Sequence, residues 1–269
     1  MRAHAKINLA LVVGPIRADG KHKVVTVLQR IDLVDDVHVA RTDQAGIEVA
    51  VSSSGDELPI DDNLIERALR DLSQAADVAP RWRAQIEKRI PIAAGLGGGS
   101  SDAAVALLLA NEMLPEPLPD TKVHELAAAL GADVPFFLAS GPQLGTGDGS
   151  TLERLQLPQD YAVVLLLPDG AVKESTGAVY ARFEREAGFD ERRKQLLTAI
   201  EAGELAALPP NDLASSPFSQ RLVELGAFRA DVSGAGPAVY GLFGDRDEAV
   251  RAAGALASLG RTITAVPAW

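Results

Sequence analysis

The sequence predicts an α+β protein of two lobes, in which helices cover one face of an antiparallel sheet. The first half of the chain opens with alternating, strand-like segments, whereas the second half follows the order β-α-α-α-β-β-α-β. We expect an N-terminal lobe over residues 1–152 and a C-terminal lobe over residues 153–269. Neither half shows an internal repeat or a low-complexity tract.

Composition narrows the functional classes. The chain has 269 residues, of which 47% are hydrophobic, so it can bury a full core. It has no cysteine, which excludes disulfides, thiolate metal sites and a cysteine nucleophile. A net charge of −11 argues against a nucleic-acid surface, and the longest apolar run, residues 161–167, is far too short to span a membrane. Because residues 1–4 show no signal-peptide pattern, we expect a cytoplasmic protein without nucleic-acid or membrane partners.

The first half is expected to begin with strands and continue with helices. Alternating apolar positions predict strands at residues 6–13, 24–33, 36–40, 46–51 and 83–90. Helical spacing and capping residues predict helices that begin at residues 61–63, 101 and 120, the last of them ending at Gly131. Residues 143–150, which include three glycines, are expected to form the turn that closes this half.

The second half is expected to open with a buried strand at residues 161–167. Helices are then expected around residues 175–186, 191–202, 217–225 and 247–259, with strands at residues 238–243 and 262–266. Residues 208–213 and 231–237 are expected to form loops, and the second of these is rich in glycine.

Two polar side chains share one face of the first strand. Because successive side chains alternate across a strand, Lys6 and Asn8 lie on the same face, opposite the apolar Ile7 and Leu9. The two polar side chains therefore project side by side from the end of the strand. A lysine that guards an edge strand against aggregation would give the same pattern.

Residues 91–104 are the most informative stretch of the chain. They hold four glycines within five residues, followed by two serines and an apolar run rich in alanine. Glycine lets a ligand approach the backbone closely, and the apolar run predicts a helix. A bare loop would therefore lead into a helix N-terminus, which is a favourable place for an anion such as phosphate.

Known phosphate-binding motifs fit this loop poorly. A P-loop needs a lysine after the glycines, and none is present. The dinucleotide fingerprint fails because Ser100 occupies its sixth position and because the proline-rich residues 114–119 stand where a second strand should begin. The remaining alternative is a glycine turn that merely caps a buried helix, although one or two glycines would suffice for that.

Two further residues have both a functional and a structural interpretation. Asp133 precedes Pro135 in a tight apolar connection, so it is either the N-cap of a short helix or a carboxylate that faces the phosphate loop. His22 lies in a polar turn, where most histidines are structural or exposed.

Three separated stretches together resemble the motifs of the GHMP kinases, which transfer the γ-phosphoryl group of ATP to small metabolites. These stretches are residues 5–9, 91–104 and 232–237, and they span most of the chain in the expected order. The resemblance implies an N-terminal lobe like domain 2 of ribosomal protein S5 and a C-terminal ferredoxin-like α/β sandwich.

The resemblance also implies roles for individual residues. Asp133 would be the general base, Lys6 would orient Asp133 and the acceptor hydroxyl, and Asn8 would contact the substrate. ATP would be bound by Pro91, Ala94, Gly95, Leu96, Gly97, Gly98, Gly99, Ser100 and Ser101, with Asn63 beside the adenine. Mg²⁺ would be carried by ATP near Ser100 or Ser101 rather than by a dedicated metal site.

Within the GHMP kinases, the nearest likeness is to those of the non-mevalonate isoprenoid pathway, whose acceptor is a methylerythritol linked to cytidine diphosphate. The cytosine would be stacked between two aromatic residues and bound by His22. Tyr180, which follows Ser175 and Thr176, would be the second of these aromatics, whereas Lys21 replaces the first. Lys21 and Thr176 would also lie at the substrate. Because of this replacement, a second function stays possible: a sister GHMP kinase that acts on a mevalonate-like or homoserine-like alcohol. A third alternative is a protein of the same fold that binds a nucleotide without catalysis.

Overall fold

The computed structural model describes residues 1–54, 56–58, 63–171, 175–183 and 187–269. The chain divides into two compact units that are not continuous in sequence. Unit 1 comprises Met1–Ala5, Leu33–Ile92 and Gly97–Ser140, and unit 2 comprises Lys6–Asp32, Ala93–Leu96 and Gly141–Trp269. The lobe boundary at residue 152 stays a prediction, and parts of the helix ends predicted at residues 61–62 and 184–186 lie outside the described residues.

The strands of unit 1 are paired around β5 (Arg81–Glu87). The end of β2 (His22–Arg41) pairs with it in antiparallel fashion, and β3 (Gly46–Ser53) pairs with it in parallel fashion. The short β4 (Asp56–Glu57) is antiparallel to β3. The predicted break within β2 is wrong, because the buried Asp35 accepts hydrogen bonds from two backbone amides and the strand continues through it.

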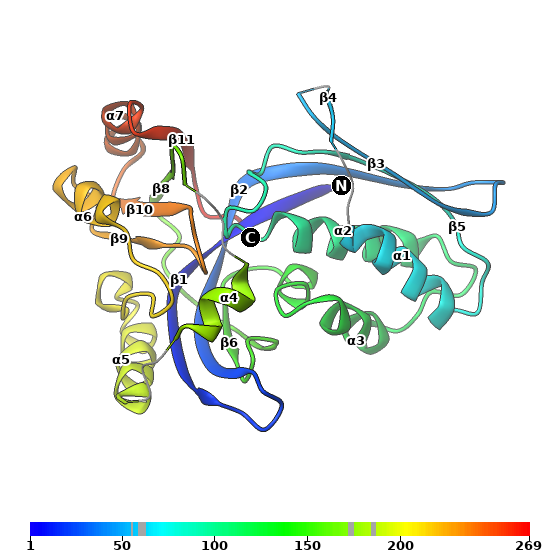
Figure 1. Ribbon diagram of the computed structural model, residues 1–269, viewed down its shortest axis with the longest axis horizontal. Helices are drawn as coiled ribbons and strands as arrows, with labels where there is room; N and C mark the ends of the chain where they lie inside the picture. Colours follow the sequence, from blue (N-terminus) through cyan, green and yellow to red (C-terminus); the bar gives the residue numbers. More distant parts are fainter. Residues whose placement is uncertain (55, 59–62, 172–174, 184–186) are drawn as a thin grey trace. The chain divides into compact units, whose positions relative to one another are not determined.

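Three helices of unit 1 pack against one another: α1 (Leu64–Ala75), α2 (Gly98–Glu112) and α3 (Asp120–Leu130) (Figure 1). Asn63 caps α1, as predicted, by accepting a hydrogen bond from the amide of Ile65 at 2.8 Å. The predicted start of α2 at Ser101 is wrong. The helix begins three residues earlier, because Gly97 serves as its N-cap with a left-handed φ of 71°.

Unit 2 contains a four-stranded sheet with the order β11–β8–β10–β9, in which all neighbours are antiparallel. Its strands are β8 (Ala162–Pro168), β9 (Arg229–Val232), β10 (Val239–Phe243) and β11 (Gly260–Ala265). Helix α6 (Pro217–Glu224) packs against β9 and β10, and α7 (Arg246–Leu256) packs against β8, β10 and β11 (Figure 1). Together with α4 (Thr176–Ala181) and α5 (Phe189–Ala202), these elements confirm the predicted order.

A core of aliphatic side chains and Phe243 joins α6 and α7 to this sheet. Apolar side chains of strands alternate toward the helices, so the sheet buries one face beneath them. Among the described residues, no helix is both long and apolar enough to cross a membrane.

The segment predicted as a closing turn is a β-hairpin. It comprises β6 (Gln143–Thr146) and β7 (Thr151–Arg154), and β6 also pairs with residues 26–28 of β2. Only the residues between these strands form the turn. The strand β6 was not predicted because Gly145, which lies inside it, was interpreted as a turn residue. A Cβ at this position would come within 2.9 Å of the Thr26 side chain, so close packing explains the glycine.

Candidate active site

Lys6 and Asn8 lie side by side on β1 (Arg2–Ile16), as their spacing predicts. Lys6 Nζ donates to Asn8 Oδ1 at 2.7 Å, and both residues are buried. Asn8 Nδ2 donates to Thr26 Oγ1 at 2.9 Å, and that hydroxyl donates in turn to the carbonyl of Ala10 at 2.8 Å. The ammonium group of Lys6 is therefore held by an amide whose orientation is itself fixed.

The glycine-rich turn at residues 233–237 lies against this pair. The amide of Asn8 donates to Ser233 Oγ at 3.4 Å. A Cβ on Gly234, whose φ is +59°, would lie 3.3 Å from Asn8 Oδ1 and 3.5 Å from Lys6 Nζ. Two of the three predicted motifs are thus in contact within unit 2.

Part of the third motif, residues 94–96, also belongs to unit 2. Each of its three carbonyls accepts a hydrogen bond. Leu96 O accepts from the amide of Lys6 at 2.9 Å, and Ala94 O accepts from the amide of Ala238 at 3.1 Å. Gly95 O accepts from Ser233 Oγ at 2.9 Å. A Cβ on Gly95 would come within 2.3 Å of Ser233 O, so glycine is required here by a close backbone approach.

The remaining glycines of the loop belong to unit 1 and open α2. The first bond within the helix runs from the amide of Ser101 to Gly97 O, so the amides of Gly98, Gly99 and Ser100 have no partner inside the helix. A Cβ on Gly99 would meet nothing within 4 Å. Packing therefore does not explain this glycine, whereas an anion at the helix N-terminus would use both the bare backbone and the unpaired amides.

A buried group of charges lies beneath this turn, and we call Lys88, Asp35 and Asp102 the Lys88 triad. Lys88 Nζ donates to Asp102 Oδ2 at 2.7 Å and also to Asp35. Burial raises the pKa of Asp102, although the neighbouring Lys88 works in the opposite direction. A Cβ on Gly98 would lie 3.1 Å from Lys88 Nζ, so this glycine makes room for the ammonium group.

Asp133 lies in a turn, half-buried, just before the 3-10 helix η1 (Pro135–Leu138). The N-cap of that helix is Val134, so the capping alternative for Asp133 is wrong. Asp133, Asn63 and Pro91 belong to unit 1, whereas Lys6 belongs to unit 2. The pairing of Asp133 with Lys6 and the adenine role of Asn63 stay predictions.

The predicted cytosine residues are brought together in unit 2. The rings of His22 and Tyr180 lie 5.8 Å apart, and Phe183 meets His22 edge-on at 5.6 Å. His22 Nδ1 lies 2.8 Å from the carbonyl of Gly14. Since a carbonyl only accepts, Nδ1 carries the proton, and in the neutral ring Nε2 is left as an acceptor. Thr176 is the first residue of α4, the helix that carries Tyr180.

Lys21, which replaces the first aromatic residue, pairs with a carboxylate. Its Nζ lies 2.8 Å from Asp148 Oδ2, and its side chain is 63% exposed. Hydrogen bonds from Lys21 and from Ser150 hold the pKa of Asp148 well below its usual range. The charge of Lys21 is thus already balanced by the protein.

Sequence reasoning missed Phe183, Thr26, Asp148 and the Lys88 triad. Phe183 follows Tyr180 by three residues, a spacing that places side chains on one helical face and could have indicated it. The partners Asp148 and Asp35 stand 127 and 53 residues from their lysines, so no local pattern connects them.

No described residues form a cluster of three or more His, Cys, Asp or Glu side chains able to hold a metal ion. Ser101 Oγ, however, is buried without a hydrogen-bond partner. A hydroxyl oxygen is a suitable ligand for Mg²⁺. The Ser101 hydroxyl therefore fits an Mg²⁺ ion that a bound nucleotide would carry.

The fold and the family comparisons define the class of protein. Residues 63–141 match the family described as GHMP kinases N terminal domain, and residues 219–262 match that described as GHMP kinases C terminal. A crystal structure of homoserine kinase from Cytophaga hutchinsonii shares the fold, with a TM-score of 0.75 and 14% identity over 100% of this chain and 96% of that one. The predicted GHMP kinase fold is confirmed.

Similar proteins narrow the class further. A 4-diphosphocytidyl-2-C-methyl-D-erythritol kinase of Chlorobium chlorochromatii is 36% identical over 278 residues, covering 97% of this chain and 94% of the relative. Another, from Geobacter sulfurreducens, is 36% identical over 94% of this chain and 92% of its own length. A crystal structure of 4-(cytidine 5'-diphospho)-2C-methyl-D-erythritol kinase has a TM-score of 0.82 and 32% identity over 100% of this chain and 99% of that one. The chain belongs to this family of GHMP kinases.

Proposed function

We propose that this chain is an ATP-dependent kinase that phosphorylates the 2-hydroxyl of 4-diphosphocytidyl-2-C-methyl-D-erythritol, a step of non-mevalonate isoprenoid precursor biosynthesis. The main support is its similarity over nearly the full length to relatives with that name. The contact of Lys6 and Asn8 with the turn at Gly234, within unit 2, supports a site built from the GHMP motifs.

The proposed chemistry is a direct transfer of the γ-phosphoryl group. Asp133 takes the proton from the acceptor hydroxyl while the oxygen of that hydroxyl forms a bond to the γ-phosphorus. The bond from the γ-phosphorus to the β–γ bridging oxygen breaks, which releases ADP. Lys6 supplies positive charge and orientation, and its amide partner Asn8 keeps the ammonium group in one position. Positioning and electrostatics account for most of the expected acceleration.

ATP is the proposed phosphate donor. The amides of Gly98, Gly99 and Ser100 would donate to phosphate oxygens at the start of α2. When bound, Mg²⁺ would neutralise charge on the transferring phosphates. Ser100 or Ser101 would lie beside it, and nucleotide oxygens and water would supply the other ligands.

The acceptor would be recognised through its cytosine. His22 Nε2, left as an acceptor by the bond of Nδ1 to Gly14 O, suits the exocyclic amino group of cytosine, which is a donor. The ring of Tyr180 offers a stacking face. Lys21 offers no aromatic face, so we expect one side of the base to be covered by an alkyl chain only.

A panel of acceptors tests this proposal. ADP release would be measured with ATP, Mg²⁺ and one of three alcohols: 4-diphosphocytidyl-2-C-methyl-D-erythritol, mevalonate or homoserine. We expect the cytidyl compound to give a kcat/KM at least 100-fold above the other two, with ³¹P NMR showing a new phosphomonoester on it. Faster turnover of mevalonate or homoserine would assign the chain to a sister activity. The absence of turnover with all three would contradict a kinase acting on any of them.

A further inference from the structure

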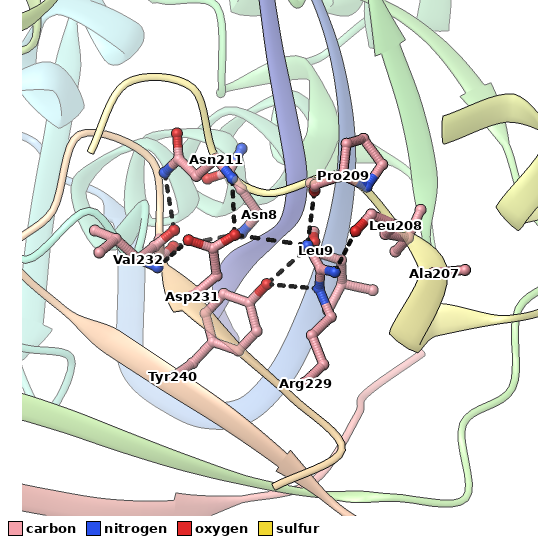
Figure 2. A network of polar contacts seen from close by, with 12 residues as sticks. Asn8, Leu9, Ala207, Leu208, Pro209, Asn211, Arg229, Asp231, Val232 and Tyr240 are labelled. Carbon is pink, nitrogen blue, oxygen red and sulfur yellow. Dashed lines mark hydrogen bonds and ion pairs between the residues drawn. The ribbon is translucent and has the colours of Figure 1, made fainter. Parts of the chain in front are cut away.

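The proposed chemistry leaves one loop without a role. Residues 208–213, which we call the bracing loop, contain Asn211 and Asp212 and join η2 (Leu205–Ala207) to the segment before α6. Figure 2 shows that the loop lies among the polar side chains of β9 and β10 and next to β1. All of these residues belong to unit 2.

Asn211 holds the glycine turn at residues 233–236 through its side-chain amide. Nδ2 donates to Val232 O at 2.9 Å and to Gly234 O at 2.6 Å, so both of its hydrogens are used on the turn. Its own amide donates to Asp231 Oδ2 at 2.8 Å, and its Oδ1 accepts from the amide of Leu213 at 2.8 Å. The residue is 8% exposed, which makes these bonds costly to replace with water.

The same loop is bonded to β1. The amide of Asp212 donates to Leu11 O at 2.9 Å, and its carboxylate accepts from the amide of Val13 at 2.9 Å. Arg229 Nη1 and Nη2 donate to Leu208 O and Pro209 O, while its Nε donates to Leu9 O at 2.9 Å (Figure 2). The bracing loop therefore fixes the strand that carries Lys6 at several points just beyond that residue.

The turn that Asn211 holds is the one that contacts Lys6 and Asn8. Ser233 Oγ accepts from the amide of Asn8, and the backbone of Gly234 packs beside Lys6 Nζ and Asn8 Oδ1. A shift of the turn would remove this support from both side chains. A misplacement of about 1 Å in a catalytic group can cost about 100-fold in rate.

We propose that Asn211 is a positioning residue, which acts on phosphoryl transfer by fixing the turn at residues 233–236 against Lys6 and Asn8. The proposal rests on the proposed kinase function for its catalytic consequence. Its structural content is independent of the acceptor, since it concerns which side chain holds the turn.

Asn211→Asp is the direct test, because it keeps the size of the side chain while removing both donors to Val232 O and Gly234 O. We expect kcat for 4-diphosphocytidyl-2-C-methyl-D-erythritol to fall 10- to 100-fold, with KM for ATP changed less than threefold. Asn111→Asp is a matched control. Asn111 also binds backbone groups through both ends of its side-chain amide, with Nδ2 donating to Leu118 O and Oδ1 accepting from the amide of Leu118, but it lies in unit 1.

A double-mutant cycle with Lys6→Ala separates positioning from simple loss of stability. If Asn211 acts through Lys6, Asn211→Asp should lower kcat less than threefold in the Lys6→Ala background. A full 10-fold loss in that background would overturn the proposal, as would an Asn211→Asp enzyme with a lower Tm but a kcat within twofold of the wild type. Asn111→Asp should lower Tm without lowering kcat.

Two further measurements keep the proposal testable if Asn211→Asp folds poorly or if the acceptor is wrong. Ser233→Ala removes only the hydroxyl that links the turn to Asn8 and Gly95. It should also lower kcat with little change in KM for ATP, and it should lower kcat less than threefold in the Lys6→Ala background. Hydrogen exchange needs no acceptor: amides at residues 232–236 should exchange at least 10-fold faster in Asn211→Asp than in Asn111→Asp. Equal exchange would overturn the proposal, whereas failure of the wild type to turn over the acceptor would overturn only the proposed function.

Discussion

Two glycine-rich turns are supported by buried polar groups of different kinds. In unit 1, the Lys88 triad lies beneath the start of α2 and consists of one ammonium group between two carboxylates. In unit 2, Arg229, Asp231, Asn211 and Tyr240, which we call the Arg229 network, support the turn at residues 233–236 (Figure 2). Most bonds of this second network end on backbone carbonyls or amides.

The difference lies in what holds each turn. In the Lys88 triad, opposite charges hold one another, so removal of Lys88 leaves two buried carboxylates without compensation. In the Arg229 network, most donors and acceptors serve main-chain groups, so removal of one side chain leaves backbone atoms without their partner. We therefore expect the loss of Lys88 to lower the free energy of unfolding strongly, and single substitutions in the Arg229 network to lower it by smaller amounts.

The largest effect is expected for Lys88→Met. The substitution keeps an unbranched side chain but leaves Asp35 and Asp102 buried and unpaired, which should cost about 3–5 kcal/mol in the free energy of unfolding. Urea denaturation measures this loss. Lys122→Met is the control, since Lys122 makes an exposed pair with Glu125 on the surface of α3 and should cost at most about 0.5 kcal/mol. Equal losses in the two variants would contradict the role of the triad.

A smaller effect is expected for Arg229→Lys. Lysine keeps the charge but cannot reach Leu9 O, Leu208 O and Pro209 O together, because it lacks the planar fork of donors. The loss should be about 1.5–3 kcal/mol in urea unfolding. A variant as stable as the wild type would show that charge, rather than directed bonds to the backbone, holds this network.

Next in size is Tyr240→Phe. The Tyr240 hydroxyl donates to Leu9 O at 3.1 Å, but that carbonyl also accepts from Arg229, so the loss should be only about 0.5–1.5 kcal/mol. Tyr161 provides the matched control in the same unit, since its buried hydroxyl has no hydrogen-bond partner. Tyr161→Phe should leave the thermal midpoint unchanged or raise it. If both variants lose equally, the bond of Tyr240 contributes nothing.

The smallest effect on stability is expected at the surface, for Lys21→Ala. Its pair with Asp148 is exposed and should contribute less than about 1 kcal/mol. The pKa of Asp148, which Lys21 holds low, should rise in the variant. Because a lowered carboxyl pKa adds stability that is lost as the pH falls, acid unfolding should then begin at a higher pH. NMR titration of Asp148 checks the shift, and an unchanged pKa would contradict the assigned cause.

Local patterns predicted much of the fold and part of the site. The alternation of residues 6–13 placed Lys6 beside Asn8, and capping residues predicted the start of α1 within residues 61–63, where Asn63 caps the helix. Hydrophobic periodicity and turn residues predicted the order of elements in the C-terminal half, although β9 extends into the loop expected at residues 231–237. Each of these features depends on residues within one turn or a few strand positions of one another.

Long-range contacts explain the errors. Separate strands were predicted at residues 24–33 and 36–40, yet β2 continues because Asp35 accepts from the amides of Arg89 and Ile90, more than 50 residues away. The helix α2 was expected to begin at Ser101, but Gly97 is its N-cap. The amides of Gly98 and Gly99 therefore lie in the first turn of the helix. Neither the Lys88 triad nor the Arg229 network leaves a local signature in the sequence.

The most direct test of the account is the rate of phosphoryl transfer in Asp133→Asn. The amide keeps the size of the side chain but cannot accept the proton of the acceptor hydroxyl. With ATP, Mg²⁺ and 4-diphosphocytidyl-2-C-methyl-D-erythritol, we expect kcat to fall about 100- to 10,000-fold. The thermal midpoint should stay within a few degrees of the wild type. A folded Asp133→Asn enzyme that retains full kcat would contradict the proposed mechanism.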